Sequence, residues 1–172
     1  MKLDVLPPKD PWYADGLDFT CSQCGNCCTG APGYVFVSRD EIGRIAEFLK
    51  LTSKELLDKY CRRVGTQISF KEKRGPGGYD CIFLQEVATT HRPKGADRDV
   101  ACTKRICSIY SVRPLQCRTW PFWDGNLASK ESWDLAAQRC PGMNTPGRRF
   151  TRQRIEELRD ATDWPHNPPS SK

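Results

Sequence analysis

Apolar side chains recur at helical spacing directly after a helix start signal at Ser38. Ser38 and Glu41 have the spacing of a capping box, in which the serine side chain accepts a hydrogen bond from the Glu41 backbone N–H. Ile42, Ile45 and Leu49 then follow at intervals that place them on one face of a helix. The pattern predicts an amphipathic helix that begins at Ser38.

A second segment of the same kind begins at Thr52. Thr52 and Glu55 form another capping box. One broad apolar face then follows, made of Leu56, Leu57, Tyr60, Cys61 and Val64. We expect a second helix that includes Cys61 and Val64 and is joined to the first by a very short turn.

Weaker signals predict two more helices. Near the C-terminus Thr151 is placed as an N-cap, and Phe150 and Ile155 have the spacing of a hydrophobic staple. A short helix is also expected over Glu131–Gln138.

Three short apolar runs predict strands over Tyr34–Val37, Ile68–Phe70 and Tyr79–Leu84. The last two flank the turn residues Arg74–Gly78, which favours a hairpin between them. The rest of the chain is rich in turn residues.

Length and hydropathy narrow the class of protein. The 172 residues suit one domain, and ten of them are cysteine. No segment has the features of a secretory signal, and no apolar run approaches the ~20 residues of a membrane span. We therefore expect a cytoplasmic protein with no membrane partner, in which thiols stay reduced and cysteines serve a purpose other than disulfides.

The densest group of cysteines is Cys21–Cys28, with the spacing C-x-x-C-x-x-C-C. In a C-x-x-C pair the two intervening residues form a tight turn, so that both sulfurs can converge on one ion. Gly25 and Gly30 permit the positive φ values that such loops often need. Three thiolates at this spacing are typical of ferredoxins, and the same spacing suits zinc.

The adjacent pair Cys27 and Cys28 indicates more than one metal centre. Neighbouring side chains usually point apart, so both sulfurs bind a single tetrahedral ion only with difficulty. Either the two cysteines serve two centres or one sulfur bridges. Eight thiolates at four ligands per centre would give two closed centres.

The other two cysteines and the two histidines are weaker candidates for metal binding. Cys61 lies on the apolar face of the second predicted helix, where a free cysteine is an ordinary buried residue. Cys102 lies in a basic loop. His91 and His166 have polar or proline-rich neighbours and are expected to be exposed. No phosphate-binding, dinucleotide or nucleophile-elbow motif is present, so no residue is assigned as a general acid, base or nucleophile, and enzyme activity is left open.

The segment Phe19–Gly30 resembles the signature of the YkgJ-type cysteine-cluster family, the CxxCxxCC zinc- or iron-chelating domain. Later segments agree in the same order: Cys81–Leu84, Cys107–Arg118, Pro121–Phe122 and Cys140–Gly142. The resemblance spans roughly residues 19–160.

The resemblance implies eight metal ligands, with an iron–sulfur cluster or zinc as the cofactor. Carried over onto this sequence, they are Cys21, Cys24, Cys27, Cys28, Cys81, Cys107, Cys117 and Cys140. Cys61 and Cys102 fall outside the set. The sequence departs from the family pattern in the long stretch Gln85–Ala101, where a shorter link is expected, so ligation by His91 or Cys102 stays open.

Positive charge is concentrated near three of these cysteines. The formal net charge is +6, and residues 92–118 hold seven of the basic side chains and only two acidic ones. Arg113 and Arg118 lie beside ligand cysteines, where a guanidinium can balance thiolate charge and donate hydrogen bonds. The run Trp120–Trp123 is expected to be core that shields a centre from water.

These observations predict a small α+β metal-stabilised domain, loop-rich, with several short helices and a β-hairpin around cysteine-ligated centres. We expect an irregular N-terminal arm over residues 1–18, a single cysteine-cluster metal-binding domain over residues 19–162, and a flexible tail over residues 163–172.

Three functions are compatible with this pattern. The first is a metalloprotein, most plausibly iron–sulfur, with a redox or accessory electron-transfer role and a protein redox partner. The second is a structural zinc protein acting as an interaction or nucleic-acid-binding module, although nucleic acid is the less favoured partner because the thiolates account for the positive charge. The third is a metal-handling protein that chelates or delivers zinc or copper(I).

Overall fold

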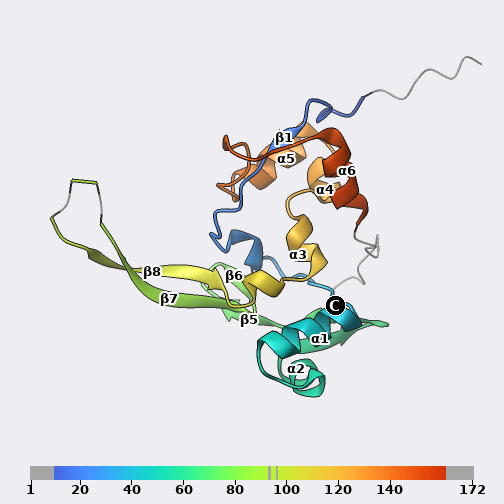
Figure 1. Cartoon of the computed structure of the whole chain (residues 1–172), viewed down its shortest axis with the longest axis vertical. Helices are drawn as coiled ribbons and strands as arrows, with labels where there is room; N and C mark the ends of the chain where they lie inside the picture. The colour runs from blue at the N-terminus through green and yellow to red at the C-terminus, as the bar shows by residue number, and fades with distance from the viewer. Residues whose placement is uncertain (1–9, 93, 96, 162–172) are drawn as a thin grey trace, which may run out of the picture.

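The computed structural model describes residues 10–92, 94–95 and 97–161 (Figure 1). The α-helices are α1 (Arg39–Phe48), α2 (Ser53–Tyr60), α3 (Leu115–Thr119), α4 (Asp124–Leu127), α5 (Lys130–Ala137) and α6 (Arg152–Asp160), and the 3-10 helices are η1 (Asn26–Cys28) and η2 (Tyr110–Val112). The strands are β1 (Leu17–Asp18), β2 (Thr29–Gly30), β3 (Cys61–Val64), β4 (Gln67–Phe70), β5 (Glu72–Gly75), β6 (Gly78–Cys81), β7 (Leu84–His91), β8 (Val100–Cys107) and β9 (Arg149–Phe150).

The strands form small antiparallel sheets rather than one central sheet. The pairings are β1 with β9, β2 with β6 and β6 with β5, β3 with β4, and β7 with β8. The fold is therefore α+β, as predicted, with its helices and sheets held together by side-chain packing.

Two hydrophobic clusters make up the core, and they occupy opposite halves of the molecule (Figure 1). Cluster 1 consists of Tyr13, Leu17, Phe19, Phe122, Leu127, Trp133, Cys140, Met143, Phe150 and Ile155. Cluster 2 consists of Val37, Ile42, Ile45, Ala46, Leu56, Cys61, Phe70, Phe83 and Ile109. Cluster 1 thus joins the N-terminal segment to α4, α5 and α6, whereas cluster 2 lies under α1 and α2.

The predicted helix starts are confirmed at side-chain level. Both capping boxes are complete: Ser38 and Thr52 accept from the backbone of Glu41 and Glu55, and each glutamate accepts from its cap residue. Thr151 caps α6, and Phe150 and Ile155 are both buried in cluster 1. The short helix expected near residue 131 is α5. Local sequence determines these ends because caps need only near neighbours.

The second helix ends earlier than predicted. Cys61 and Val64 lie in β3, not on a helical face. The reason is the hairpin with β4, in which Cys61 pairs with Phe70 and Val64 with Gln67. Gly65, with φ of 58°, closes the two-residue turn. Cross-strand pairing in the core outweighs the helical spacing.

The predicted hairpin has the right turn but the wrong partner. Residues 75–78 do reverse the chain, yet they join β5 to β6, while β4 pairs with β3. The expected strand over Tyr34–Val37 is reduced to one isolated bridge, between Phe36 and Ser69. Backbone hydrogen bonds from Val37 to Ile68 and from Phe70 to Val35 still hold that segment beside β4.

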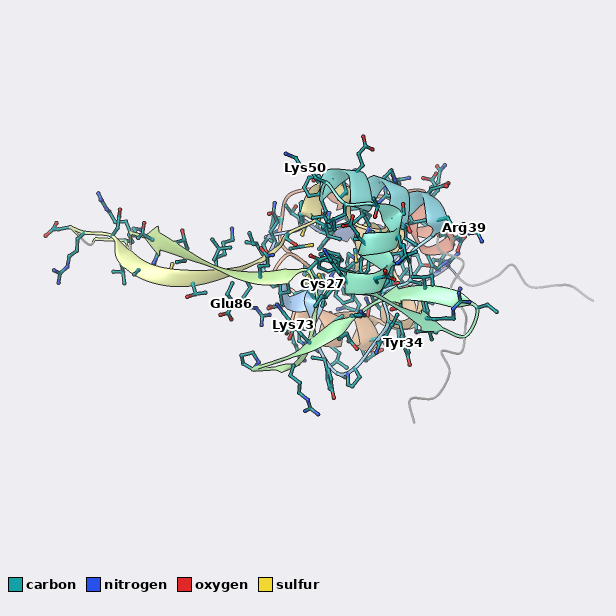
Figure 2. All side chains as sticks on the ribbon, turned by 90° about the horizontal axis from the view of Figure 1, so that it is seen from below. Cys27, Tyr34, Arg39, Lys50, Lys73 and Glu86 are labelled. Atoms are coloured by element: carbon teal, nitrogen blue, oxygen red, sulfur yellow. The ribbon has the colours of Figure 1, made fainter. Side chains whose placement is uncertain are left out.

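The stretch Gln85–Ala101, interpreted from sequence as an inserted loop, belongs to a long hairpin of β7 and β8. The two strands pair over eight residues each, and both figures show the hairpin projecting from the body (Figures 1 and 2). Cys102 therefore lies in a strand, not a loop, and both Cys102 and His91 are exposed. Strand pairing was the missed signal, because Val87, Thr89 and Val100 are β-formers on either side of Gly95.

The described part of the N-terminal arm, residues 10–18, contacts the core. From residue 10 onward it packs on cluster 1 through Tyr13 and Leu17, and the Trp12 indole donates a hydrogen bond to the Leu127 carbonyl oxygen (2.8 Å). His166 and the predicted tail over residues 163–172 lie outside the described residues. Within the described ranges no helix is long and apolar enough to cross a bilayer.

Candidate metal centre

The loop that carries Cys21–Cys28 is fixed at both ends. At its start the Thr20 backbone N–H donates to the Gly142 carbonyl oxygen (2.9 Å), and at its end β2 pairs with β6. Between these points Gly25, with φ of 75°, leads into η1, which contains Cys27 and Cys28. A Cβ atom at Gly25 would lie 2.9 Å from the Leu84 Cδ1 atom, so the loop lies against the base of β7.

Arg139 attaches this loop to the end of α5. The Asn26 side-chain amide donates to the Arg139 carbonyl oxygen (2.8 Å), and the Arg139 guanidinium donates to the Thr29 carbonyl oxygen (2.9 Å). The sequence analysis did not select Arg139. The available signal was its position directly before Cys140, the same argument that selected Arg113 and Arg118.

Gly142 leaves no room for a side chain where the chain approaches Thr20. A Cβ atom there would lie 2.1 Å from the Thr20 carbonyl oxygen, and that oxygen belongs to the backbone next to Cys21. The approach fixes the relative positions of Cys21 and Cys140.

Replacing Gly142 by alanine is expected to lower the free energy of unfolding by about 3 kcal/mol, since backbone must move to admit the methyl group. In a chain of this size the thermal midpoint should fall by about 6–12 °C. Gly43→Ala is the matched control: Gly43 is exposed within α1 and a Cβ atom there meets nothing within 4 Å. That variant should gain about 0.5–1 kcal/mol. Equal midpoints for the two variants would contradict the close approach.

The other candidate ligands come from four separate elements. Cys81 ends β6, Cys107 ends β8, Cys117 lies in α3, and Cys140 follows α5. Strand ends and a short helix are stiff supports, because their backbone is hydrogen-bonded up to the cysteine. The fold therefore delivers residues far apart in sequence to the same region.

All eight predicted ligands line one cavity of about 50 Å³. Cys21 and Cys140 approach it from cluster 1, and Cys81 and Cys107 approach it from cluster 2. Cys61 and Cys102 do not line it: Cys61 is 6 % exposed in cluster 2, and Cys102 is exposed on β8. All ten cysteines lie in the described residues, and all are free thiols.

Cys27 is the exposed member of the set. It also borders two outer cavities, of about 320 and 390 Å³. The first is walled by Tyr34, Tyr79 and Trp123, and the second lies beside Arg139. The thiol cavity thus reaches the surface at Cys27.

Hydrogen bonds among the thiols shift their pKa values in opposite directions. The Cys27 and Cys28 sulfurs are 3.9 Å apart. The hydrogen bond from Cys28 lowers the pKa of Cys27 and that of Cys107 to about 7 each, with Arg113 contributing, and it raises the pKa of Cys28. Burial raises the pKa of Cys81 to about 11 and that of Cys117 well above its ordinary value. Two thiols are therefore close to ionisation at neutral pH.

Arg113 supplies the positive charge of the cavity. Its guanidinium lies 3.6 Å from the centre of the Tyr110 ring, and its buried Nε–H donates to no acceptor in the described structure. Arg118, also predicted to support the thiolates, is exposed and does not line the cavity. The structure thus separates two arginines that the sequence could not distinguish.

Two aromatic side chains also contact the candidate ligands. The Trp120 indole N–H donates to the Cys140 sulfur (3.5 Å), and a hydrogen bond to Cys21 raises the pKa of Tyr110. Phe122 is 1 % exposed in cluster 1. Within the run Trp120–Trp123, predicted to be core, Pro121 and Phe122 are buried, whereas Trp120 and Trp123 are half-buried.

The thiols surround the cavity without forming a finished coordination shell. Among the described residues, no three Cys, His, Asp or Glu side chains meet at the geometry of a metal site. The donor set nevertheless suits a thiophilic ion: eight sulfurs face one space, together with a buried N–H donor that lacks an acceptor.

Comparison with known proteins identifies this arrangement. Residues 20–141 match the CxxCxxCC family, described as "Putative zinc- or iron-chelating domain". The chain is also 34% identical over 110 residues to "Uncharacterized protein MJ0661" of Methanocaldococcus jannaschii, a match that covers 64% of this chain and 48% of that protein. The chain thus spans about half the length of the curated relative it matches. No solved structure matches this chain. Since the family match extends over most of the chain and includes all eight candidate ligands, the protein belongs to the CxxCxxCC family of zinc- or iron-chelating domains.

Proposed function

We propose that the protein binds metal through its eight clustered cysteines as two adjacent thiolate-ligated centres, within the single domain of residues 19–162. The observation that carries the proposal is the common cavity, which all eight cysteines line and from which Cys61 and Cys102 are absent. We expect the cysteine side chains to rotate on metal binding, because no three of them are grouped as a metal site in the described structure.

The thiols fall into two groups of four by their neighbours. Besides burial, the pKa of Cys117 is raised by the charges of Cys81, Cys27 and Cys107, and the Cys28 thiol is bonded to Cys107. Burial raises the pKa of Cys140, and the thiols that add to this increase are Cys24 and Cys27. We assign Cys28, Cys81, Cys107 and Cys117 to one centre and Cys21, Cys24, Cys27 and Cys140 to the other. Cys27 lies between the groups.

The surroundings of the thiols support an iron–sulfur protein with an electron-transfer role. The Trp120 indole N–H donates to the Cys140 sulfur, and Arg113, whose buried Nε–H has no acceptor among the described residues, lines the same cavity. Hydrogen bonds to cluster sulfurs are a recognised means of setting a reduction potential. Trp120 lines the cavity and limits contact with water there, while Cys27 is exposed. When bound, such a cluster would supply one-electron chemistry.

Zinc is the second candidate, and the size of the cavity favours it. About 50 Å³ accommodates single ions with less displacement of the thiols than cubane clusters require. Closed four-thiolate zinc sites are structural and lack an open position for substrate. A zinc protein of this kind would act as an interaction module or hold metal for delivery.

Reduced thiols at all ten positions suit a cytoplasmic location, which we include in the proposal.

A nucleic-acid role would have to use the projecting β7–β8 hairpin. That hairpin carries basic side chains, but it also carries Glu86 and Asp99, and the Arg92–Asp99 ion pair (2.8 Å) neutralises part of the charge. The charge distribution therefore gives nucleic acid little support.

Metal analysis of protein purified under anaerobic and reducing conditions tests the proposal. We expect metal in every preparation, with either two zinc ions per chain or iron and acid-labile sulfide in equal amounts. An absorption band near ~400 nm and brown colour would identify the iron–sulfur form. A folded, metal-free protein obtained directly from cells grown with both metals would refute metal binding.

A further inference from the structure

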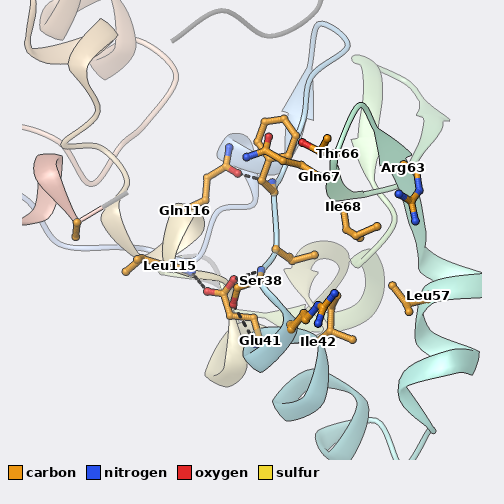
Figure 3. Close-up of a pocket in the computed structure, with 14 residues that line it drawn as sticks. Ser38, Glu41, Ile42, Leu57, Arg63, Thr66, Gln67, Ile68, Leu115 and Gln116 are labelled. Atoms are coloured by element: carbon orange, nitrogen blue, oxygen red, sulfur yellow. Dashed lines mark hydrogen bonds between the residues drawn. The ribbon is translucent and has the colours of Figure 1, made fainter. Parts of the chain in front are cut away.

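An open groove of about 650 Å³, distinct from the thiol cavity, is lined in part by residues of α3 (Figure 3). Its walls come from the start of α1, from β4 and the 36–38 segment beside it, and from Leu115 and Gln116 of α3. The volume is within the range of about 300–1,000 Å³ that is common for binding sites. Exposed Ser38, Arg63 and Thr66 form its rim, so a segment of polypeptide can enter from solvent.

The floor of the groove is apolar. Phe36, Leu57, Ile68 and Leu115 line it and are only half-buried, although each belongs to or follows an ordered element. Covering such side chains releases about 25 cal/mol per Å² of apolar surface. The floor therefore favours an occupant that brings an apolar side chain.

The charge available at the rim is positive. Arg39 and Arg63 both line the groove, are exposed, and form no ion pair or hydrogen bond with any described residue. The single carboxylate, that of Glu41, is already used: its oxygens accept from the backbone N–H groups of Ser38 (2.9 Å) and Leu115 (2.6 Å), as the dashed lines in Figure 3 indicate. An incoming carboxylate thus meets two unpaired guanidinium groups and no competing acid.

We propose that this groove docks an acidic segment of a partner protein, with its carboxylates on Arg39 and Arg63 and an apolar side chain on the floor. Guanidinium groups bind carboxylates through paired N–H donors, which gives such a contact orientation as well as charge complementarity. This proposal deepens the proposed function, on which its significance rests, because it specifies what kind of protein would approach the metal centres.

Helix α3 contributes residues both to the groove and to the thiol cavity. Leu115 and Gln116 line the groove, while Cys117, the next residue, lines the thiol cavity. Gln116 also accepts from the Phe36 backbone N–H (2.6 Å) and donates to the Tyr34 carbonyl oxygen (2.8 Å). A partner seated in the groove would therefore lie next to the helix that carries a candidate ligand.

Fluorescence anisotropy on the full-length, metal-loaded chain tests the proposal. The probe is a fluorescein-labelled peptide of sequence Glu-Asp-Leu-Glu-Phe-Asp-Glu, compared with one peptide that has lysine for every acid and one that has serine for Leu and Phe. We expect saturable binding of the first peptide only. Equal binding of all three, or of none, would overturn the proposal.

Matched protein variants locate the site. Arg39→Glu/Arg63→Glu should weaken binding of the acidic peptide at least about tenfold, whereas Arg44→Glu/Arg98→Glu makes the same charge change at exposed positions outside the groove and should leave affinity within about twofold. Equal weakening by both variants would reduce the effect to net charge and reject the groove. Metal content is measured in each sample: a wild-type protein with full metal content that does not bind the acidic peptide counts against docking alone, whereas absence of metal from the wild-type protein counts against the proposed function.

Two other occupants would overturn the proposal in recognisable ways. Ala161, the last residue that the structure describes, lines the groove. If a peptide with the sequence of residues 162–172 displaces the acidic probe more tightly than unlabelled probe does, the groove belongs to the chain's own C-terminal residues. If sedimentation shows a dimer that Arg39→Glu/Arg63→Glu dissociates, the occupant is a second copy.

Discussion

Replacement of Cys117 or Cys140 by serine is expected to remove about half of the bound metal, because each belongs to a different proposed centre. A serine hydroxyl is a poor ligand for zinc or iron where a thiolate is required. Cys61→Ser is the matched control, since Cys61 is as buried as Cys140 but packs in cluster 2 away from the thiol cavity. It should keep the full metal content and lose only the modest stability that burial of an extra hydroxyl costs.

The pattern across variants tests the partition as well as the ligand set. If two centres exist as assigned, Cys117→Ser and Cys140→Ser should each retain the metal of the other centre, and the double variant should retain none. Metal counts per chain, measured on protein that remains folded by circular dichroism, give the answer. Complete loss in either single variant would replace the two-centre assignment with one shared centre. Equal loss in Cys61→Ser would overturn the ligand set itself.

The sequence alone was sufficient wherever the determining contacts are local. The capping boxes at Ser38 and Thr52 and the cap at Thr151 are satisfied within three residues, so their prediction required no knowledge of the fold. The C-x-x-C-x-x-C-C loop is similar, because its spacing brings thiols together whatever surrounds it. The interpretation of Cys61 as a buried residue outside the ligand set is consistent with its burial in cluster 2, although it lies in β3 and not in the predicted helix.

The sequence alone did not indicate which strands pair with one another. β3 forms in place of the end of the predicted helix because it pairs with β4, where Cys61 lies opposite Phe70. No pattern within residues 56–64 indicates this pairing. The β7–β8 hairpin was interpreted as a loop because most of its side chains are exposed, which removes the alternation that marks a half-buried strand. The difference between Arg113 and Arg118 likewise became visible only in the fold, where Arg113 follows η2 and lines the thiol cavity, whereas Arg118 lies in α3 and is exposed.

The division of the core into two clusters changes what metal binding is expected to do for the fold. Cys21 and Cys140 pack with cluster 1, Cys81 and Cys107 pack with cluster 2, and the thiol cavity lies between them. A metal bound there would cross-link two apolar cores, each smaller than a domain of this length usually builds. The same ions would also neutralise the thiolates that converge in the cavity.

Removal of the metal is therefore expected to unfold most of the chain. Structural zinc contributes about 10 kcal/mol or more per site in small metal-dependent domains, comparable with the whole stability of about 5–15 kcal/mol of a typical domain. We expect one cooperative thermal transition in the loaded protein, and its loss on treatment with a chelator under reducing conditions. Tryptophan emission is the sharpest probe, because Trp133 is 1 % exposed in cluster 1 and Trp120 borders the cavity.

Two buried isoleucines show whether the metal couples the clusters. Ile155 in cluster 1 and Ile45 in cluster 2 are both fully buried, and truncation of either to alanine should cost about 2–5 kcal/mol. In the loaded protein each variant should lower the same single midpoint, whether it is followed by tryptophan emission or by helical circular dichroism. Restoring stoichiometric metal to stripped wild-type protein should restore that transition. A stripped chain that keeps its midpoint and its tryptophan emission would show that the clusters hold without metal, and would favour a protein that exchanges metal while remaining folded.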